Sequence, residues 1–298
     1  MGRGGGPRGG AAGRRDPVPP AVWRVEGQER NSGRVMGAQD GPTMVCAHGF
    51  GCGQSMWRFV APAFAADHRV VLFDHSGCGA SHPTAHDPVR HADLAGYAAD
   101  VVEIVEAVGQ GDEHGDGRGP VVLVGHSVSA VIALLAAADR PDLFDRLVLV
   151  GPSPRYVDDD GYRGGFTAEE IDELLETMDA NYLGWTQVMA PVIAGNPDRP
   201  ALGDELAAVF RRNDPAIARQ FARATFLGDN RADLARVRTR SLVVQGREDV
   251  IAPPEVGRYV HEHLPGSDLV VIDSVGHCPN LSHPALLVRA MRDWLGAA

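Results

Sequence analysis

The sequence predicts an α/β fold built on a mostly parallel, doubly wound sheet into which a block of helices is inserted. Short β-branched runs alternate with longer helical patterns along most of the chain. The alternation stops after Gly151, only helical patterns occur between Phe166 and Phe226, and strands resume at Leu242. Continuous apolar strands are typical of a parallel sheet covered on both faces. The order strand, helix, strand favours a doubly wound arrangement.

The predicted strands are short runs of aliphatic residues. They are Thr43–Ala47, Val70–Phe73, Val121–Val124, Leu147–Val150, Leu242–Gln245 and Leu269–Ile272. The helices predicted between and after them have apolar residues at helical spacing, and they are Leu94–Val108, Val128–Ala138 and Ala285–Leu295. The polar, glycine-rich segment 110–120 is predicted to be a surface loop.

The inserted block is predicted to form a helical lid. Its helices are Ala168–Tyr182, Trp185–Ala194, Asp204–Arg211 and Pro215–Phe226, and Thr167 with Glu170 forms a capping box at the start of the first. We therefore expect a core made of residues 21–153 and 227–298, and a lid made of residues 154–226. Residues 1–20 are rich in Gly, Pro and Arg and are predicted to be a disordered tail.

Composition excludes several classes of partner. The formal net charge is −11, whereas nucleic acid and anionic lipid call for a basic surface. The longest apolar stretch, Val121 to Ala138, is interrupted by His126 and Ser127, which argues against a membrane span. All basic residues are Arg, so chemistry that depends on a lysine amine is ruled out. We expect neither nucleic acid nor a membrane as a partner.

The cysteine pattern argues against a metal site. Cys46, Cys52, Cys78 and Cys278 form no CxxC pair, and their spacing matches no zinc motif. Unpaired thiols are typical of a reducing compartment, so we expect a cytoplasmic protein. Nothing in the sequence calls for a metal or a cofactor.

The strongest motif is VVLVGHSVSAVIALL, in which an apolar strand runs through Gly125-His126-Ser127-Val128-Ser129 into a helix. This is the strand–turn–helix context of a nucleophile elbow, which holds a serine in a strained turn. The positions two before and two after the nucleophile must be small because strand and helix nearly touch there. Gly125 meets this requirement, and Ser129 departs from the usual glycine but is still small. Ser127 is the candidate nucleophile.

A serine hydroxyl needs a base to take its proton and an acid to orient that base. On such a scaffold the chain order is serine, acid, histidine. Asp249 follows one late strand and His277 follows the last, so both should lie at the edge of the sheet where ligand sites form. Glu248 is the alternative acid. His126, next to the nucleophile, should point away from it and is not expected to be the base.

An oxyanion formed during acyl transfer needs backbone N–H donors aimed at it. Val128, which follows the nucleophile, should supply one, and Phe50 in the loop His48-Gly49-Phe50-Gly51 should supply the other. A glycine-rich loop after a strand is also compatible with phosphate binding. The absence of GxGxxG and of a Walker lysine makes that interpretation weak.

These motifs together resemble the RsbQ-like branch of the α/β-hydrolases, which contains a bacterial sigma-factor stress regulator and the plant karrikin and strigolactone receptors. The matching segments include HGFGCGQSMW, VVLFDHSGCGAS, VGHSVSA, LVLVGPSPRY, NYLGW, EDVIAP and GHCPNLSHP, and they extend from about residue 43 to the end of the chain. The resemblance implies an α/β-hydrolase fold with a four-helix lid and a triad of Ser127, Asp249 and His277. It also places Phe50, Phe166, Trp185, Met189 and Phe226 at an apolar pocket; at Met189 family members often have an aromatic residue.

Two functions are compatible with this resemblance. One is an esterase that hydrolyses a small, apolar, neutral ester or lactone. The other is a sensor with little turnover that binds a regulatory protein through its lid, where Glu169, Asp172, Glu173, Glu176 and Asp179 form an acidic face. That face is also what the solvated side of an amphipathic helix would show, which is the simpler interpretation.

Overall fold

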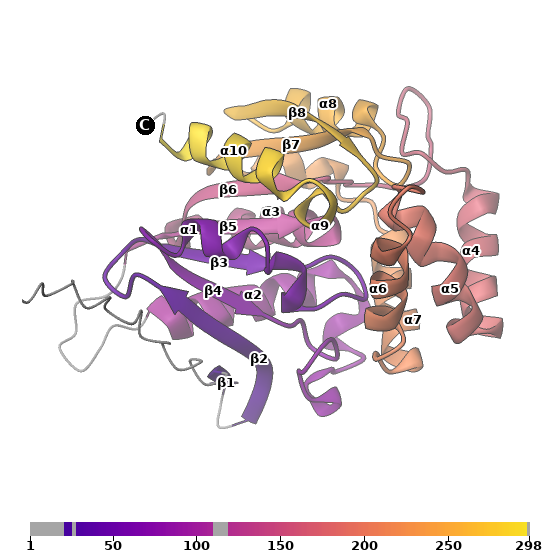
Figure 1. Ribbon diagram of the computed structural model, residues 1–298, viewed down its shortest axis with the longest axis horizontal. Coiled ribbons are helices and arrows are strands. Elements are labelled where there is room, and N and C mark those ends of the chain that lie inside the picture. Colours follow the sequence, from indigo (N-terminus) through magenta and orange to yellow (C-terminus); the bar gives the residue numbers. More distant parts are fainter. Residues whose placement is uncertain (1–20, 26–27, 110–118, 297–298) are drawn as a thin grey trace, which may run out of the picture.

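The computed structural model describes residues 21–25, 28–109 and 119–296. The predicted tail at 1–20 and nearly all of the predicted loop at 110–120 lie outside these residues. A sheet of eight strands, in the order β1-β2-β4-β3-β5-β6-β7-β8, forms the centre of the described part (Figure 1). The strands are β1 (Ala21–Val25), β2 (Gln28–Gly37), β3 (Thr43–Ala47), β4 (Arg69–Phe73), β5 (Val121–His126), β6 (Phe144–Val150), β7 (Arg240–Glu248) and β8 (Ser267–Val275).

The sheet is parallel from β4 through β8, which confirms the predicted fold class. β2 pairs antiparallel with β4 and with β1, and this pair of strands at the edge was not predicted. The stretch that forms β2 is mostly polar, and a strand near the edge of a sheet is not buried on both faces. It therefore lacks the continuous aliphatic run by which the central strands are recognised.

Alternate residues of the central strands face two separate cores. In β3, Val45 belongs to a core with α2 (Leu94–Gly109), α3 (Val128–Asp139) and α8 (Pro254–His263). Its neighbour Cys46 belongs to a second core, with α1 (Ala61–Phe64) and α10 (Pro284–Leu295). The two-residue period of a strand thus covers both faces of the sheet with helices. The short helix α9 (Pro279–Ser282) precedes α10. Helix α8 was not predicted.

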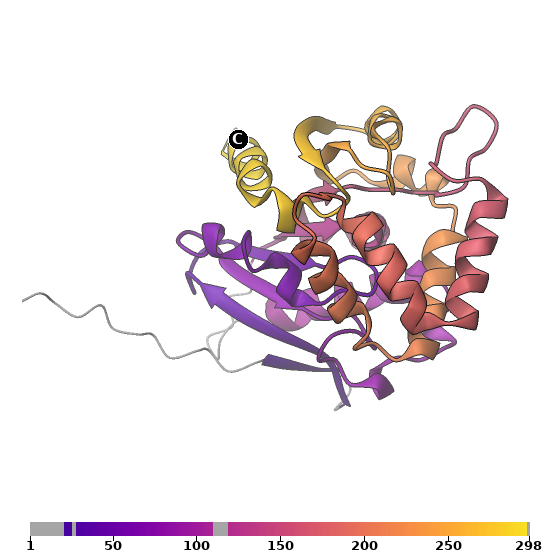
Figure 2. The same ribbon diagram turned by 45° about the vertical axis from the view of Figure 1, so that its right-hand side comes forward.

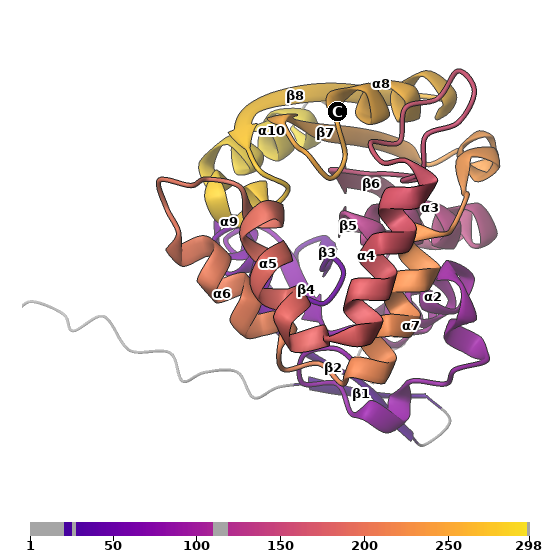
Figure 3. The same cartoon turned by 90° about the vertical axis from the view of Figure 1, so that its right-hand side faces the viewer.

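Four helices, α4 (Ala168–Ala180), α5 (Tyr182–Ala194), α6 (Ala201–Phe210) and α7 (Pro215–Phe226), lie over the ends of the parallel strands. Figures 2 and 3 show this group, which we call the helical layer, in front of the strand ends. The predicted capping box of Thr167 and Glu170 is present at the start of α4. Asn181 ends α4 and caps α5, so the break between them is a single residue. The helical layer shares its buried side chains with the first core.

Candidate active site

Ser127 lies at the turn between β5 and α3 in a conformation that is rare for a residue with a side chain. Its φ is 59° and its ψ −125°, in the left-handed half of conformational space. The turn is tight because a Cβ added to Gly125 would lie 2.2 Å from the carbonyl oxygen of Ser129. The Ser127 N–H donates to the carbonyl of Val150, 2.8 Å away, which ties the turn to β6. The structure therefore contains the predicted elbow.

His277 and Asp249 lie on the loops that follow β8 and β7, and both contact the elbow through a chain of hydrogen bonds. The Nε2 atom of His277 is 2.7 Å from the Oγ of Ser127, and its Nδ1 atom is 2.7 Å from an Asp249 carboxylate oxygen. An ionised carboxylate only accepts, so His277 donates through Nδ1–H and its Nε2 accepts from the Ser127 hydroxyl. The three residues are buried, and their chain of hydrogen bonds ends on the candidate nucleophile.

The structure distinguishes the two candidate acids. The second oxygen of Asp249 accepts the backbone N–H groups of Ile251 at 2.9 Å and Ala252 at 3.0 Å, so its carboxylate is held in a fixed orientation. Glu248, one residue earlier, has an exposed side chain. Of these two acids, Asp249 is the one that is hydrogen-bonded to His277.

His126 does not contact the hydroxyl of Ser127 and instead holds the loop of His277. Its Nε2–H donates to the carbonyl of His277, 2.7 Å away. Burial, with the nearby ring of His277, lowers the pKa of His126 to about 3, so the ring is neutral at ordinary pH. The expectation that His126 is not the base agrees with this geometry.

The two candidate oxyanion donors belong to segments that converge on Ser127. Val128 is the first residue of α3, so its N–H has no acceptor within the helix. Phe50 lies in the loop after β3, where a Cβ on Gly49 would lie 2.8 Å from the His126 ring and one on Gly51 would lie 2.9 Å from the Phe210 ring. Gly49 therefore allows the loop to approach the elbow closely, and Gly51 allows it to approach α6.

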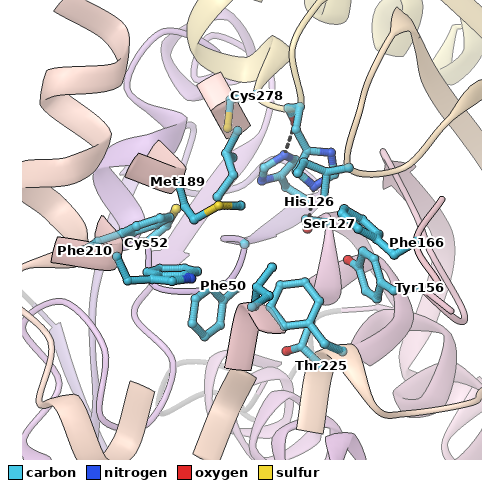
Figure 4. A pocket seen from close by; sticks show the side chains of 17 residues that line it. Phe50, Cys52, His126, Ser127, Tyr156, Phe166, Met189, Phe210, Thr225 and Cys278 are labelled. Atoms are coloured by element: carbon cyan, nitrogen blue, oxygen red, sulfur yellow. Dashed lines mark hydrogen bonds between the residues drawn. The ribbon is translucent and has the colours of Figure 1, made fainter. Parts of the chain in front are cut away.

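An apolar cavity lies between the elbow and the helical layer. In Figure 4, Phe50, Tyr156, Phe166 and Met189 surround the space next to Ser127. Its wall includes all five predicted pocket residues, Phe50, Phe166, Trp185, Met189 and Phe226, together with Cys52, Tyr156, Leu174, Ile193, Phe210, Thr225, Ile251 and Cys278. No Asp, Glu or Arg lines the described part of this cavity. The chemistry that it favours is that of a neutral ligand.

Tyr156 is a cavity residue that the sequence analysis missed. Burial raises the pKa of its hydroxyl to about 12, and a hydrogen bond with Ser127 partly opposes that shift. Tyr156 lies on the segment that leaves β6, at the same edge of the sheet as Asp249 and His277. Its position after a predicted strand was the available signal.

Within the described residues, no group of three or more His, Cys, Asp or Glu side chains is arranged to hold a metal ion. All four cysteines are unpaired and buried. Burial raises the pKa of Cys278, and it raises the pKa of Cys52 together with the nearby Cys278 and Cys78. The cavity thiols are therefore protonated, and Ser127 is the candidate nucleophile of the cavity.

The site belongs to a scaffold that is widely shared. A profile of the alpha/beta hydrolase family matches residues 44–290. The chain belongs to this family. The α/β-hydrolase is 39% identical to a protein described as a probable esterase from Oryza sativa subsp. japonica, over 88% of this chain and 94% of the relative. It is 37% identical to a protein described as a strigolactone esterase from Arabidopsis thaliana, over 87% and 94%.

A solved structure of a hydrolase from Oleispira antarctica superposes on the α/β-hydrolase with a TM-score of 0.84. The two are 34% identical, over 89% of this chain and 94% of the other. The chain is also 37% identical to a protein described as a karrikin insensitive 2 receptor from Petunia hybrida, over 88% of this chain and 94% of the relative. These matches confirm the predicted enzyme class and the predicted relationship to this group of plant proteins. None of the helices in the described ranges has the length and apolar character needed to cross a membrane.

Proposed function

We propose that this α/β-hydrolase cleaves a small, apolar, neutral ester or lactone, with Ser127 as nucleophile, His277 as base and Asp249 as the acid that orients the base. The observation that carries this proposal is the continuous chain of two 2.7 Å contacts from Asp249 through His277 to Ser127, which ends at the wall of the apolar cavity. A hydroxyl becomes a competent nucleophile when its hydrogen already points at a neutral, oriented imidazole.

The reaction would run in two halves. Ser127 Oγ attacks the ester carbonyl carbon while its proton passes to His277 Nε2, and the N–H groups of Phe50 and Val128 stabilise the oxyanion. The intermediate collapses to an acyl-enzyme, and His277 returns the proton to the departing alkoxide. Water, deprotonated by His277, then attacks the acyl carbon; the bond to Ser127 Oγ breaks, His277 returns the proton to that oxygen, and the acid is released. Every step uses groups of the chain and water, so no metal or cofactor is required.

The cavity supports a neutral substrate. Its wall is almost wholly aliphatic and aromatic, and no charged side chain of the described residues lines it. A charged acyl group would lose its hydration there without gaining an ionic partner, which is unfavourable. Phe50, Phe166, Trp185, Met189 and Phe226 are therefore proposed as substrate contacts.

We further propose that residues 154–226 act as a lid on the core formed by 21–153 and 227–298. Phe166, Leu174, Trp185 and Met189 line both the cavity and an open groove between α4 and α5, which supports entry of the substrate by this route. Separation of α4 from α5 would widen it.

The two ends of the proposed lid are connected to each other. Arg155 pairs with Asp229 at 2.8 Å, Arg231 pairs with Asp159 at 2.8 Å, and the N–H of Asn230 donates to the carbonyl of Pro154. These contacts support hinges near residues 154 and 227 that move together.

A cytoplasmic location is also proposed. It is supported by the four unpaired thiols, which are typical of a reducing compartment.

A panel of p-nitrophenyl esters tests the substrate class. Acetate and butyrate should be hydrolysed, with laurate and the charged succinate monoester much poorer substrates. A preference for laurate or succinate would contradict the proposed cavity chemistry. Metabolic enzymes turn over about 1–1000 times per second, so the rate on the preferred ester also separates an enzyme from a sensor.

A ligand sensor is the second candidate, favoured by the similarity to a protein described as a karrikin insensitive 2 receptor and by the outer surface of the helical layer. Leu183, Val188 and Val192 of α5 are exposed aliphatic residues, and the acidic residues of α4 are exposed beside them. A ligand that binds one lid position better than another would shift the balance between them and change this surface for a regulatory protein. Pull-downs from the native host with wild type and Ser127→Ala test this role. Fast ester turnover with no regulatory protein retained by either bait would exclude it.

A further inference from the structure

Three buried polar side chains next to the site take no part in the proposed triad. His48 follows β3, His75 follows β4 by two residues, and Ser129 is the second residue of α3. All three have 0% of their surface exposed to solvent. Because a buried polar group is costly unless it is hydrogen-bonded, the partners of these side chains show what they hold together.

The hydroxyl of Ser129 connects the start of α3 to the end of β3. Its Oγ lies 2.5 Å from the carbonyl oxygen of His48 and 2.7 Å from the Nε2 atom of His75. A carbonyl only accepts, so the single hydrogen of Ser129 is donated to His48. Ser129 must then accept from His75, which fixes the proton of that ring on Nε2.

A second set of bonds closes the connection through β4. The backbone N–H of His75 donates to Nε2 of His48 at 3.1 Å, and Nδ1–H of His48 donates to the carbonyl of Gly49 at 2.8 Å. The His75 ring is neutral, because burial and the nearby rings of His48 and His91 lower its pKa well below the usual range. The three segments are thus joined by a closed ring of hydrogen bonds.

This ring includes residues that are close in sequence to the two candidate oxyanion donors. Ser129 is the next residue after Val128, and His48 is two residues before Phe50. The bond between Ser129 and His48 therefore joins the two segments that carry the donors, and the bond from His75 keeps the Ser129 hydroxyl in place. We propose that Ser129 and His75 are positioning residues that set the spacing of the Phe50 and Val128 N–H groups for the oxyanion. This inference rests on the proposed acyl-transfer function.

The close contact of strand and helix explains why the residue at position 129 must be small, and the hydrogen bonds explain why it is serine. A Cβ on Gly125 would lie 2.8 Å from the backbone nitrogen of Ala130, so β5 and α3 touch at this point. Glycine or alanine at position 129 would also fit, but neither could bond to His48. The serine in place of the usual glycine of the elbow thus has a role beyond packing.

The first test compares wild type with Ser129→Ala on the preferred neutral ester. Loss of one oxyanion donor costs about 10²–10³ in kcat, so misalignment of two donors that remain should cost about 10–100-fold in kcat with little change in KM. The second readout is the affinity for 4-fluorophenylboronic acid, measured by ¹⁹F NMR. Its tetrahedral adduct with Ser127 places an oxygen between the two candidate oxyanion donors. In Ser129→Ala, the affinity for the boronic acid should fall in parallel with kcat, whereas the affinity for planar 4-fluorobenzamide should be unchanged.

Substitutions of His75 provide an independent test of the positioning role. His75→Gln can keep an N–H donor near the position of Nε2 and should retain most activity, whereas His75→Leu should lose activity in the same pattern as Ser129→Ala. The double variant Ser129→Ala/His75→Leu should be no worse than Ser129→Ala alone, because the two residues act through one bond. Ser241→Ala is the matched control: this buried serine donates to the Thr239 carbonyl at the start of β7, at the opposite end of the sheet.

Unchanged kcat in Ser129→Ala, or equal weakening of boronate and benzamide, would overturn the proposal. If Ser129→Ala does not fold, the contrast between His75→Gln and His75→Leu decides, and equal activity of the two would overturn it. Failure of the wild type to form a boronate adduct on Ser127 would instead reject the proposed function. An adduct that is equally stable in wild type and Ser129→Ala would reject only the positioning role.

Discussion

The backbone N–H of His277 donates to the carbonyl of Ile193, 2.9 Å away, so the proposed base is bonded directly to helix α5. The carbonyl of His277 is held from the other side by His126 of the core. Asn196, in the loop after α5, adds a bond from its side chain to the carbonyl of Val275 at 2.8 Å. Movement of α5 would therefore move the base relative to Ser127, and this connects the proposed lid to the chemistry.

A substitution at Gly276 tests this connection. Gly276 has a φ of +81°, and an added Cβ would lie 2.0 Å from the carbonyl oxygen of Ala194 at the end of α5. Gly276→Ala should force the His277 loop and α5 apart and lower kcat by about 100-fold, as expected when a reacting group is misplaced by about 1 Å. Steady-state kinetics on the preferred ester measure this.

Gly266→Ala is the control for backbone strain. Gly266 also has a positive φ, +69°, but no atom lies within 4 Å of the Cβ that would be added. Both variants should lose stability from the left-handed conformation, by about 1 kcal/mol. Equal kcat values for the two variants would mean that contact with α5 does not position the base.

Asp249 and Glu248 can be separated by isosteric amides. Asp249→Asn should lower kcat by about 10³–10⁴-fold, because an amide can reverse the tautomer of His277 and remove its acceptor nitrogen from Ser127. Glu248→Gln should leave kcat little changed, because that side chain is exposed. A larger effect of Glu248→Gln, measured with the same ester, would assign the acid role to Glu248.

Met189 should influence which acyl chains fit. Its side chain lines both the cavity and the groove between α4 and α5. Met189→Phe adds volume to a packed wall, so kcat/KM for butyrate should fall more than kcat/KM for acetate, by about 10-fold if one or two methylenes lose their site. Val188→Phe is the matched control, because Val188 lines only the groove. The same change of acyl preference in both variants would argue against Met189 as a cavity residue.

Stability should fall below about pH 6.5 because of buried histidines. Burial lowers the pKa values of His48, His75 and His126, the last to about 3, from the ordinary value of 6.5. As the pH falls below 6.5, the unfolded chain binds protons that the folded chain cannot, so the free energy of unfolding decreases. Each such histidine should contribute about 1.4 kcal/mol per pH unit between pH 6.5 and its folded pKa.

Urea denaturation at pH values from 5 to 7 measures this slope. His75→Gln removes one of the groups and should reduce the slope by about one histidine's contribution. An unchanged slope in His75→Gln, or stability that rises as the pH falls through 6.5, would show that these rings are protonated in the folded protein.

Much of the fold and of the site was predictable from the sequence. The buried parallel strands are continuous aliphatic runs, and the elbow, the proposed acid and the proposed base each follow such a run. Residues that lie at the ends of parallel strands meet at one edge of the sheet, so strand order alone brought Ser127, Asp249 and His277 together. The four inserted helices could be predicted because their amphipathic patterns and the capping box are local signals in the sequence.

The features that were missed depend on contacts between distant residues. Strand β2 is mostly polar and pairs with the distant strand β4, and β1 pairs with β2. Tyr156 lies in a loop with no repeating pattern, and its place next to Ser127 depends on how that loop turns over the elbow. The ring of bonds among His48, His75 and Ser129 joins positions up to 81 residues apart, and no local pattern encodes such a contact.

The central claim is that Ser127 carries the acyl group, and intact-protein mass spectrometry tests it most directly. Rapid mixing with p-nitrophenyl butyrate followed by acid quenching should give a protein heavier by one butyryl group. Peptide mapping should place that group on Ser127. The adduct should be absent in Ser127→Ala, and that variant should have no turnover although it remains folded. An acyl group found on another residue, or turnover retained by Ser127→Ala, would contradict the account.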